Sequence, residues 1–398
     1  MKIAFFSENF YPEISGISDS ITTTAKELVK LGHQIRFFVP NYSIKNYLTA
    51  GLKAKQEIDL GHNIEITRLF SLPYPAPTKQ GRMVIPSFSC LLKIKKFKPD
   101  IIHTHLFFGA GIEALIAAKL FGIPLVGTNH TAISEFVRYI PFLKSKWLES
   151  ASIKYANWYY GKCNFVSAPS KSVFTEMEGF GFKVAHSVIS NPVSLEAFKV
   201  NPEQKKEDLK KHFGINDKTV LYVGRFAKEK NIDVIIQALA IVKKKIPDVR
   251  LALAGHGAEQ EAMKSLVKKL DLEENVLFTG TLNKFELADL YRASEIFVIT
   301  STSETQSMTL IQAMACGLPA IGVRARALPE YIEGNGILIE PGDFKALAQE
   351  IIRLLEDPNL RAELGRRGEI FVQKFSEKNI AREWENVYKK QLDNYQKI

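Results

Sequence analysis

The chain has 398 residues, a formal net charge of +10 and an apolar fraction of 46%. This length predicts two domains of roughly 200 residues each, and the composition is typical of a globular protein rather than a disordered one. No apolar run reaches the roughly 18 residues that a membrane-spanning helix needs, and the first residues are too poor in apolar side chains for a signal peptide. Three scattered cysteines without metal-ligand spacing indicate reduced thiols in a cytosolic protein.

Strand and helix patterns alternate along the whole chain. The first half holds the apolar runs KIAFFS, QIRFFVP, PDIIHTHL, GIPLVGTNH and FVSAPS, and the second half holds TVLYVGRF, VRLALAG, NVLFTG, EIFVIT and LPAIGV. Runs of this kind separated by helical patterns predict an α/β fold with two doubly wound, mostly parallel sheets. The turn-rich segment 188–198 reads as the hinge. We therefore predict domains at 1–195 and 196–377, with a C-terminal helix at 378–398 that packs back on the first domain.

Charge is divided unevenly between these halves. Residues 1–200 carry a net charge of +9 out of the total of +10. Many cytosolic domains are mildly basic, which is one interpretation. The other is attraction to an anionic membrane surface, where each nearby Lys or Arg contributes about 1 kcal/mol. Nucleic acid is not favoured as a partner, because no basic stripe is interleaved with stacking aromatic residues.

The most informative segment is 298–322, VITSTSETQSMTLIQAMACGLPAIG. It reads as a short buried strand, a polar loop with the single carboxylate Glu304, and a helix that ends before Gly317. The first turn of a helix presents unpaired backbone N–H groups, so its start at Ser307 and Met308 is a natural seat for a phosphate. A carboxylate beside that seat accepts hydrogen bonds from a polyol. Together these features predict a nucleotide sugar as the ligand.

A second motif, GRFAKEKN, follows the strand TVLYV directly. Arg225 and Lys230 are expected at the carboxyl end of that strand, where a planar guanidinium and a movable ammonium suit a diphosphate. A solvated basic turn is the alternative, since Lys228 lies there too. Open α/β sheets bind ligands at the carboxyl ends of their strands, and we expect those ends to face one cleft.

Two histidines and an aromatic helix admit more than one interpretation. His103 and His105 lie two apart on a predicted strand, and packed or cleft-lining histidines are favoured over a metal site, because no third ligand has suitable spacing. The segment 140–162 mixes six aromatic residues with four lysines. It suits either a membrane interface or packing into the core of the first domain. The absence of Asp-x-Asp fits a site that neutralises diphosphate without a metal ion.

Taken in order, the SGIS loop, DIIHTH, TNHT, GRFAKEKN, AGHG and SETQSMTLIQAMACGLP resemble glycosyltransferase family 4. The resemblance spans almost the whole chain. It implies the GT-B fold, two Rossmann-like domains facing a central cleft, and transfer with retention of anomeric configuration. FSENFYPEISG and SETQSMTLIQ are similar, more narrowly, to diacylglycerol glucosyltransferases. No cofactor other than the nucleoside diphosphate sugar is implied, and no metal.

The resemblance also assigns roles to residues. Gly16 would contact donor phosphate, His130 would lie in the cleft and orient the sugar, and Gly257 would lie near the nucleotide. Arg225 and Lys230 would bind the diphosphate, and Glu304 would open the E-x7-E motif and bind sugar hydroxyls. The second acid of that motif falls on Gln312. An amide at this position lacks the charge-assisted bond to ribose, which predicts donor binding weaker by about 1 kcal/mol.

The sequence thus predicts a retaining hexosyltransferase that uses UDP-glucose and a lipid acceptor such as diacylglycerol. It would be cytoplasmic and peripheral on the inner face of the cell membrane. Mannosyl transfer from GDP-mannose, or transfer to a soluble acceptor, shares the chemistry and stays open. A glycoside hydrolase needs paired carboxylates, whereas the strongest motif here offers one acid and a glutamine. A Rossmann dehydrogenase needs G-x-G-x-x-G after its first strand, and KIAFFSENFYPEISG lacks it. A catalytically silent binding protein would bind the donor without releasing nucleotide.

Overall fold

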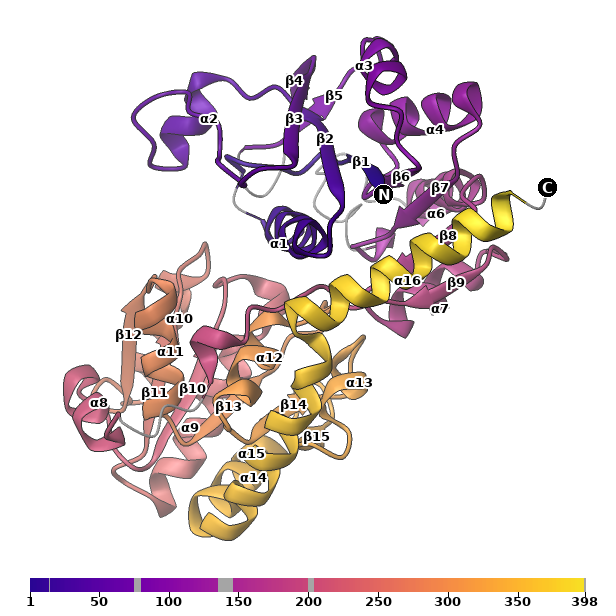
Figure 1. Cartoon of the computed structure of the whole chain (residues 1–398). Coiled ribbons are helices and arrows are strands. Elements are labelled where there is room, and N and C mark those ends of the chain that lie inside the picture. Colours follow the sequence, from indigo (N-terminus) through magenta and orange to yellow (C-terminus); the bar gives the residue numbers. More distant parts are fainter. Residues whose placement is uncertain (14, 75–79, 135–145, 200–203, 397–398) are drawn as a thin grey trace. The chain divides into compact units, whose positions relative to one another are not determined.

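The computed structural model describes residues 1–13, 15–74, 80–134, 146–199 and 204–396 (Figure 1). The chain forms two compact units. Unit 1 consists of Met1–Pro192 together with Glu377–Ile398, and unit 2 consists of Val193–Ser376. The segment 140–145, on which part of the predicted aromatic helix falls, lies outside the described residues.

Unit 1 is built on a seven-stranded sheet with the order β3-β2-β1-β6-β7-β8-β9. All strand pairings of this sheet among the described residues are parallel. Its strands are short and mostly buried, which is why the sequence shows them as continuous apolar runs rather than alternating ones. They are β1 (Lys2–Phe6), β2 (Gln34–Pro40), β3 (Ile64–Leu69), β6 (Ile101–Thr104), β7 (Leu125–Thr128), β8 (Phe165–Ala168) and β9 (His186–Val188).

Helices cover both faces of this sheet, and two apolar clusters fill the spaces beneath them (Figure 1). One cluster includes Trp384 and Tyr388 of the C-terminal helix, which packs beside the first helix of the chain. A small antiparallel hairpin of β4 (Ser71–Pro73) and β5 (Arg82–Val84) stands apart from the sheet. The helices are α1 (Gly16–Lys30), α2 (Ile44–Thr49), α3 (Cys90–Phe97), α4 (Gly109–Phe121), α6 (Lys146–Tyr160), α7 (Lys171–Glu178) and α16 (Glu377–Tyr395).

Unit 2 has a six-stranded parallel sheet with the order β12-β11-β10-β13-β14-β15. Its strands are β10 (Thr219–Val223), β11 (Arg250–Ala254), β12 (Val276–Gly280), β13 (Ile296–Ile299), β14 (Ala320–Val323) and β15 (Ile337–Ile339). The order runs outward in both directions from β10 and β13, so the carboxyl ends of these two strands mark the topological switch point where such sheets bind ligands.

The helices of unit 2 enclose its sheet and share one large apolar core with it (Figure 1). They are α8 (Lys206–Phe213), α9 (Ile232–Lys245), α10 (Gln260–Lys269), α11 (Lys284–Ala293), α12 (Met308–Ala315), α13 (Leu328–Ile332), α14 (Phe344–Glu356) and α15 (Pro358–Val372), with 3-10 turns at Glu196–Phe198, Lys228–Lys230 and Gln373–Phe375. The predicted fold, two parallel-sheet Rossmann-like domains, is confirmed.

Candidate active site

A pocket of about 290 Å³ opens in unit 2 at the carboxyl ends of β10 and β13. It contains five of the residues that the sequence singles out: Arg225, Lys230, Glu304, Ser307 and Met308. The loops after the two paired strands supply them, as the strand-end argument predicts. The remaining lining residues are Tyr222, Val223, Gly224, Ile299, Ser301, Gln306 and Thr309.

Lys230 and Glu304 form an ion pair within this pocket. Lys230 Nζ lies 2.6 Å from Glu304 Oε1 and 3.4 Å from Ser301 Oγ. Both charged side chains are largely buried, with exposed fractions of 19% and 14%. The ammonium therefore stays in the pocket rather than extending into solvent, which excludes the solvated-turn interpretation for Lys230.

Arg225 has an acidic neighbour of its own. Its Nη2 lies 2.5 Å from Glu229 Oε1, one helical turn away in sequence, and about half of the arginine side chain is exposed. Glu229 is not among the residues predicted from the sequence. Its i+4 spacing from Arg225 favours an ion pair only on a helix, and residues 225–227 are not helical. The two expected diphosphate ligands are thus both held by carboxylates of unit 2.

The polar loop ends in the N-cap of α12. The Ser307 hydroxyl accepts a hydrogen bond from the backbone N–H of Leu310, and Ser307 is buried. Met308 and Thr309, which open the helix, line the pocket. The positive end of the α12 dipole therefore lies beside Lys230, an arrangement that favours an anion.

Gln312 and Gly257 take positions outside the group of described residues that line this pocket. Gln312 Oε1 lies 3.4 Å from the buried Tyr291 hydroxyl on α11. A Cβ on Gly257 would come within 2.1 Å of the Phe226 carbonyl oxygen, so this glycine allows its loop to pack on the loop that carries Arg225. The nucleotide contact of Gly257 and the ribose contact of Gln312 stay predictions.

Gly16 and His130 belong to unit 1. Gly16 is the exposed first residue of α1, and no described atom lies within 4 Å of where its Cβ would be. His130 follows β7, is buried, and has Nε2 3.1 Å from His105 Nδ1 and Nδ1 3.1 Å from Asn191 Oδ1. Burial lowers the pKa of His130 to about 4, whereas the hydrogen bond that His130 Nδ1 donates to Asn191 Oδ1 opposes this shift. The imidazole is therefore neutral at physiological pH, and both of its ring nitrogens contact other side chains of unit 1.

His103 and His105 are packed residues, both buried. His103 Nδ1 lies 2.7 Å from the Tyr388 hydroxyl and its Nε2 lies 2.7 Å from Thr128 Oγ1. Burial holds the pKa of both histidines well below the ordinary value. Among the described residues, no group of three His, Cys, Asp or Glu side chains is arranged to hold a metal ion.

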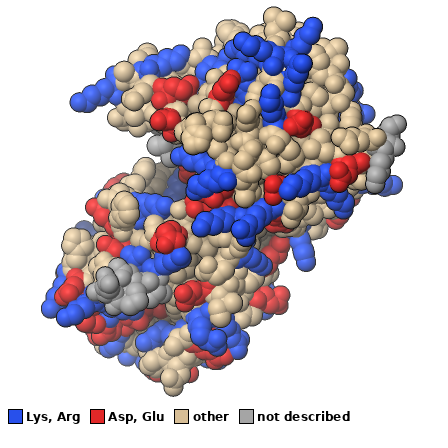
Figure 2. Space-filling model, in the orientation of Figure 1, with Lys and Arg blue, Asp and Glu red and all other residues tan. Residues whose placement is uncertain are grey.

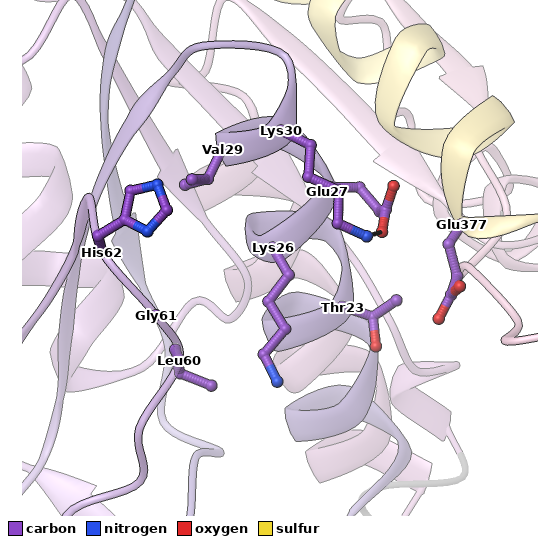
Figure 3. Close-up of a pocket in the computed structure, with 9 residues that line it drawn as sticks. All are labelled: Thr23, Lys26, Glu27, Val29, Lys30, Leu60, Gly61, His62 and Glu377. Carbon is purple, nitrogen blue, oxygen red and sulfur yellow. Dashed lines mark hydrogen bonds and ion pairs between the residues drawn. The ribbon is translucent and has the colours of Figure 1, made fainter.

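Another pocket, of about 410 Å³, lies in unit 1 beside the second half of α1 (Figure 3). Leu60, Gly61 and His62, which precede β3, form one wall, and Lys30 lies against Glu27 on the helix. The pocket lies at the amino ends of the strands, whereas open parallel sheets bind ligands at the carboxyl ends. We therefore give this pocket no part in the candidate active site.

Comparison with known proteins identifies the family of the chain. Residues 14–197 match the family described as Glycosyltransferase Family 4, and residues 203–371 match Glycosyl transferases group 1. The alpha-monoglucosyldiacylglycerol synthase of Streptococcus pneumoniae is 32% identical over 328 residues, which cover 81% of this chain and 70% of that protein. The chain belongs to glycosyltransferase family 4. The predicted family and the predicted enzyme class, a glycosyltransferase, are confirmed.

Further similar proteins include a second synthase, a mannosyltransferase and a solved structure. The alpha-monoglucosyldiacylglycerol synthase of Acholeplasma laidlawii is 25% identical over 408 residues, covering 100% of this chain and 99% of that one. A GDP-mannose-dependent alpha-mannosyltransferase of Corynebacterium glutamicum is 26% identical over 92% of this chain and 83% of its own. The structure of Anabaena HepE in complex with UDP superposes with a TM-score of 0.78 at 21% identity, covering 98% of this chain and 100% of that one. That likeness shows the shared GT-B fold.

Proposed function

We propose that this glycosyltransferase moves glucose from UDP-glucose to the hydroxyl of a diacylglycerol, with retention of anomeric configuration. The observation that carries the donor part is the pocket of unit 2, where Lys230, Arg225 and the start of α12 gather positive charge beside Glu304. In the transfer, the bond from the anomeric carbon to the diphosphate oxygen breaks and a bond to the acceptor oxygen forms. The acceptor proton passes to the leaving phosphate. Cationic groups at the diphosphate stabilise the charge that develops there, which is usually the largest catalytic contribution.

The names of two relatives, both alpha-monoglucosyldiacylglycerol synthases, support diacylglycerol as the acceptor. A second candidate is mannosyl transfer from GDP-mannose, which the relationship to the Corynebacterium mannosyltransferase favours. The deciding experiment offers UDP- and GDP-linked glucose and mannose to the purified chain with diacylglycerol in mixed micelles or with soluble glycosides. UDP release that depends on UDP-glucose and diacylglycerol is expected. GDP release with GDP-mannose alone would overturn the proposal in favour of the second candidate.

A lipid acceptor requires the enzyme to work at a membrane surface, and the exposed apolar residues of unit 1 support this part of the proposal. No helix in the described part of the chain combines the length and apolarity that a bilayer span needs. The large apolar side chains that stand exposed among the described residues belong to unit 1, apart from Phe285 and Ile370. On α6, Trp147 and Trp158 are 74% and 50% exposed, whereas Tyr159 and Tyr160 are buried. Tyr159 and Tyr160 pack in the core of unit 1, and the exposed Trp147 and Trp158 support the proposed membrane interface.

A second group of exposed apolar side chains, with lysines beside it, lies on α3 and the β4–β5 hairpin. Leu72 and Met83 are opposite each other in the hairpin ladder, so their half-exposed side chains share one face. Leu92 on α3 is 80% exposed. Basic side chains gather over α3 (Figure 2), where the chain supplies the exposed lysines Lys93, Lys95, Lys96 and Lys98. Apolar insertion with lysines at the phosphate level is the pattern of an interfacial helix.

Vesicle co-sedimentation tests the membrane part separately from catalysis. With vesicles containing anionic lipid, Trp147→Ser combined with Trp158→Ser is expected to reduce the bound fraction several-fold, because two interfacial aromatic anchors are lost. Phe285→Ser is the control, since Phe285 is as exposed as Trp147 but lies on unit 2. Equal binding of both variants and the wild type, or equal binding to vesicles without anionic lipid, would contradict membrane docking by these residues.

A further inference from the structure

Lys230 and Glu304, the ion pair of the donor pocket, lie on different loops and are 74 positions apart in sequence. Lys230 lies near the end of the turn after β10, which we call the lysine turn (residues 224–231). Glu304 lies in the loop after β13, which we call the acidic loop (residues 300–307). The strands themselves pair in the sheet. Pairing of the two strands brings the loops together, but it does not fix the positions of Lys230 and Glu304 within those loops.

Neutral hydrogen bonds join the two loops directly. The Thr300 hydroxyl donates to the backbone carbonyls of Lys230, at 2.9 Å, and of Asn231, at 3.0 Å. In return, Asn231 Nδ2 donates to the Thr300 carbonyl at 3.1 Å. Thr300 is buried, with 2% of its surface exposed. This reciprocal set of bonds, the Asn231–Thr300 clasp, ties the end of the lysine turn to the start of the acidic loop.

The backbone of Asn231 shows why this residue suits the clasp. It has φ 49° and ψ 45°, in the left-handed region, and it precedes α9 without capping the helix through its side chain. Asparagine and glycine tolerate this conformation best. Glycine would hold the turn equally well but would offer no side-chain donor to Thr300. The chain therefore has, at this position, the residue type that satisfies the backbone and the clasp together.

The clasp matters because the ion pair cannot hold the geometry on its own once a donor binds. An incoming diphosphate competes with Glu304 for the Lys230 ammonium, so the attraction between the two side chains is redistributed. The hydrogen bonds of Asn231 and Thr300 involve neutral groups and backbone carbonyls and are unaffected by that exchange. They keep Lys230 in place while its charge changes partner.

We propose that Asn231 and Thr300 are positioning residues for Lys230 in the transfer reaction, an inference that rests on the proposed function. Neither residue is among those that line the pocket. They act through the backbone of the lysine turn, by fixing where the ammonium lies relative to the α12 start and to Glu304. A fixed charge of this kind stabilises the transition state less when the position of the charged group varies.

The test compares variants at both ends of the same sheet. Thr300→Val removes the hydroxyl at constant shape, and Asn231→Gly removes the side-chain donor while keeping a residue suited to positive φ. The matched controls lie at the amino ends of the strands of unit 2. Thr219 donates its buried hydroxyl to the Asn216 carbonyl, and Asn275 donates to the carbonyls of Pro247 and Val249. Thr219→Val and Asn275→Ala therefore remove similar bonds far from the pocket.

Thr300→Val and Asn231→Gly are each expected to lower kcat/KM for the donor by about tenfold, the effect of losing one well-placed hydrogen bond. The loss should lie mainly in kcat, and Thr300→Ser should recover activity to within about twofold. The controls should lower the melting temperature comparably and leave kcat/KM within about twofold of wild type. Wild-type kinetics in both clasp variants, or an equal kinetic loss in Thr219→Val, would overturn the positioning role. A wild-type chain that transfers no sugar would overturn the proposed function as well.

Discussion

Replacing Lys230 by alanine removes the ammonium that lies beside Glu304 in the pocket that the start of α12 also lines. Two unit charges about 4 Å apart attract by about 4 kcal/mol at an effective dielectric of about 20. The lysine side chain is 19% exposed, and residual screening reduces this figure. A loss of about 3 kcal/mol in transition-state stabilisation remains, which corresponds to more than a hundredfold in kcat/KM.

The assay is nucleotide release under donor-limited conditions, with melting temperature as the check on folding. Lys228→Ala is the matched control, because Lys228 lies in the same turn but is exposed and does not line the pocket. Its kcat/KM is expected to stay within about twofold of wild type, as for other solvated charges. A loss of less than about fivefold in Lys230→Ala, or equal losses in both variants, would refute the assignment of Lys230 to the diphosphate.

Three further outcomes are expected. Gln312→Glu should lower the donor KM about fivefold through a charge-assisted ribose bond, and an unchanged KM would contradict that contact. His130→Asn should flatten the pH dependence of the free energy of unfolding. The pKa of about 4 in the folded state lies below the ordinary value of 6.5, so the wild type loses up to about 3 kcal/mol of stability as the pH falls from 6.5 to 4. Urea unfolding over this pH range measures the difference. Gly257→Ala should destabilise the protein by about 2 kcal/mol, because its Cβ would meet the Phe226 backbone, whereas Gly16→Ala should leave the melting temperature unchanged. Equal melting temperatures for the two glycine variants would contradict the packing role.

Much of the fold and half of the site follow from local sequence patterns. Buried parallel strands appear in the sequence as apolar runs. The residues directly after these strands lie together at the carboxyl ends of the sheet, which is why the sequence predicts that Lys230 and Glu304 are close. The signal in both cases is short-range: a charged or polar residue at a fixed distance from a strand end. Two such signals on neighbouring strands specify a site without any knowledge of tertiary contacts.

Other features depend on contacts that no local pattern contains. The aromatic segment of α6 has a uniform composition, yet Tyr160 is buried and Trp158 is half exposed, because helix rotation against the sheet decides which face is covered. The Asn231–Thr300 clasp joins positions 69 apart. Asn231 reads in the sequence as an ordinary turn residue, and only its left-handed backbone and its partner reveal the further role.

The central claim is that the unit 2 pocket binds the diphosphate of the donor. A crystal structure with UDP tests it most directly. We expect both phosphates at the carboxyl ends of β10 and β13, with Lys230 Nζ within hydrogen-bonding distance and the α12 start facing the distal phosphate. UDP bound elsewhere on the chain, with Lys230 still paired only to Glu304, would contradict it.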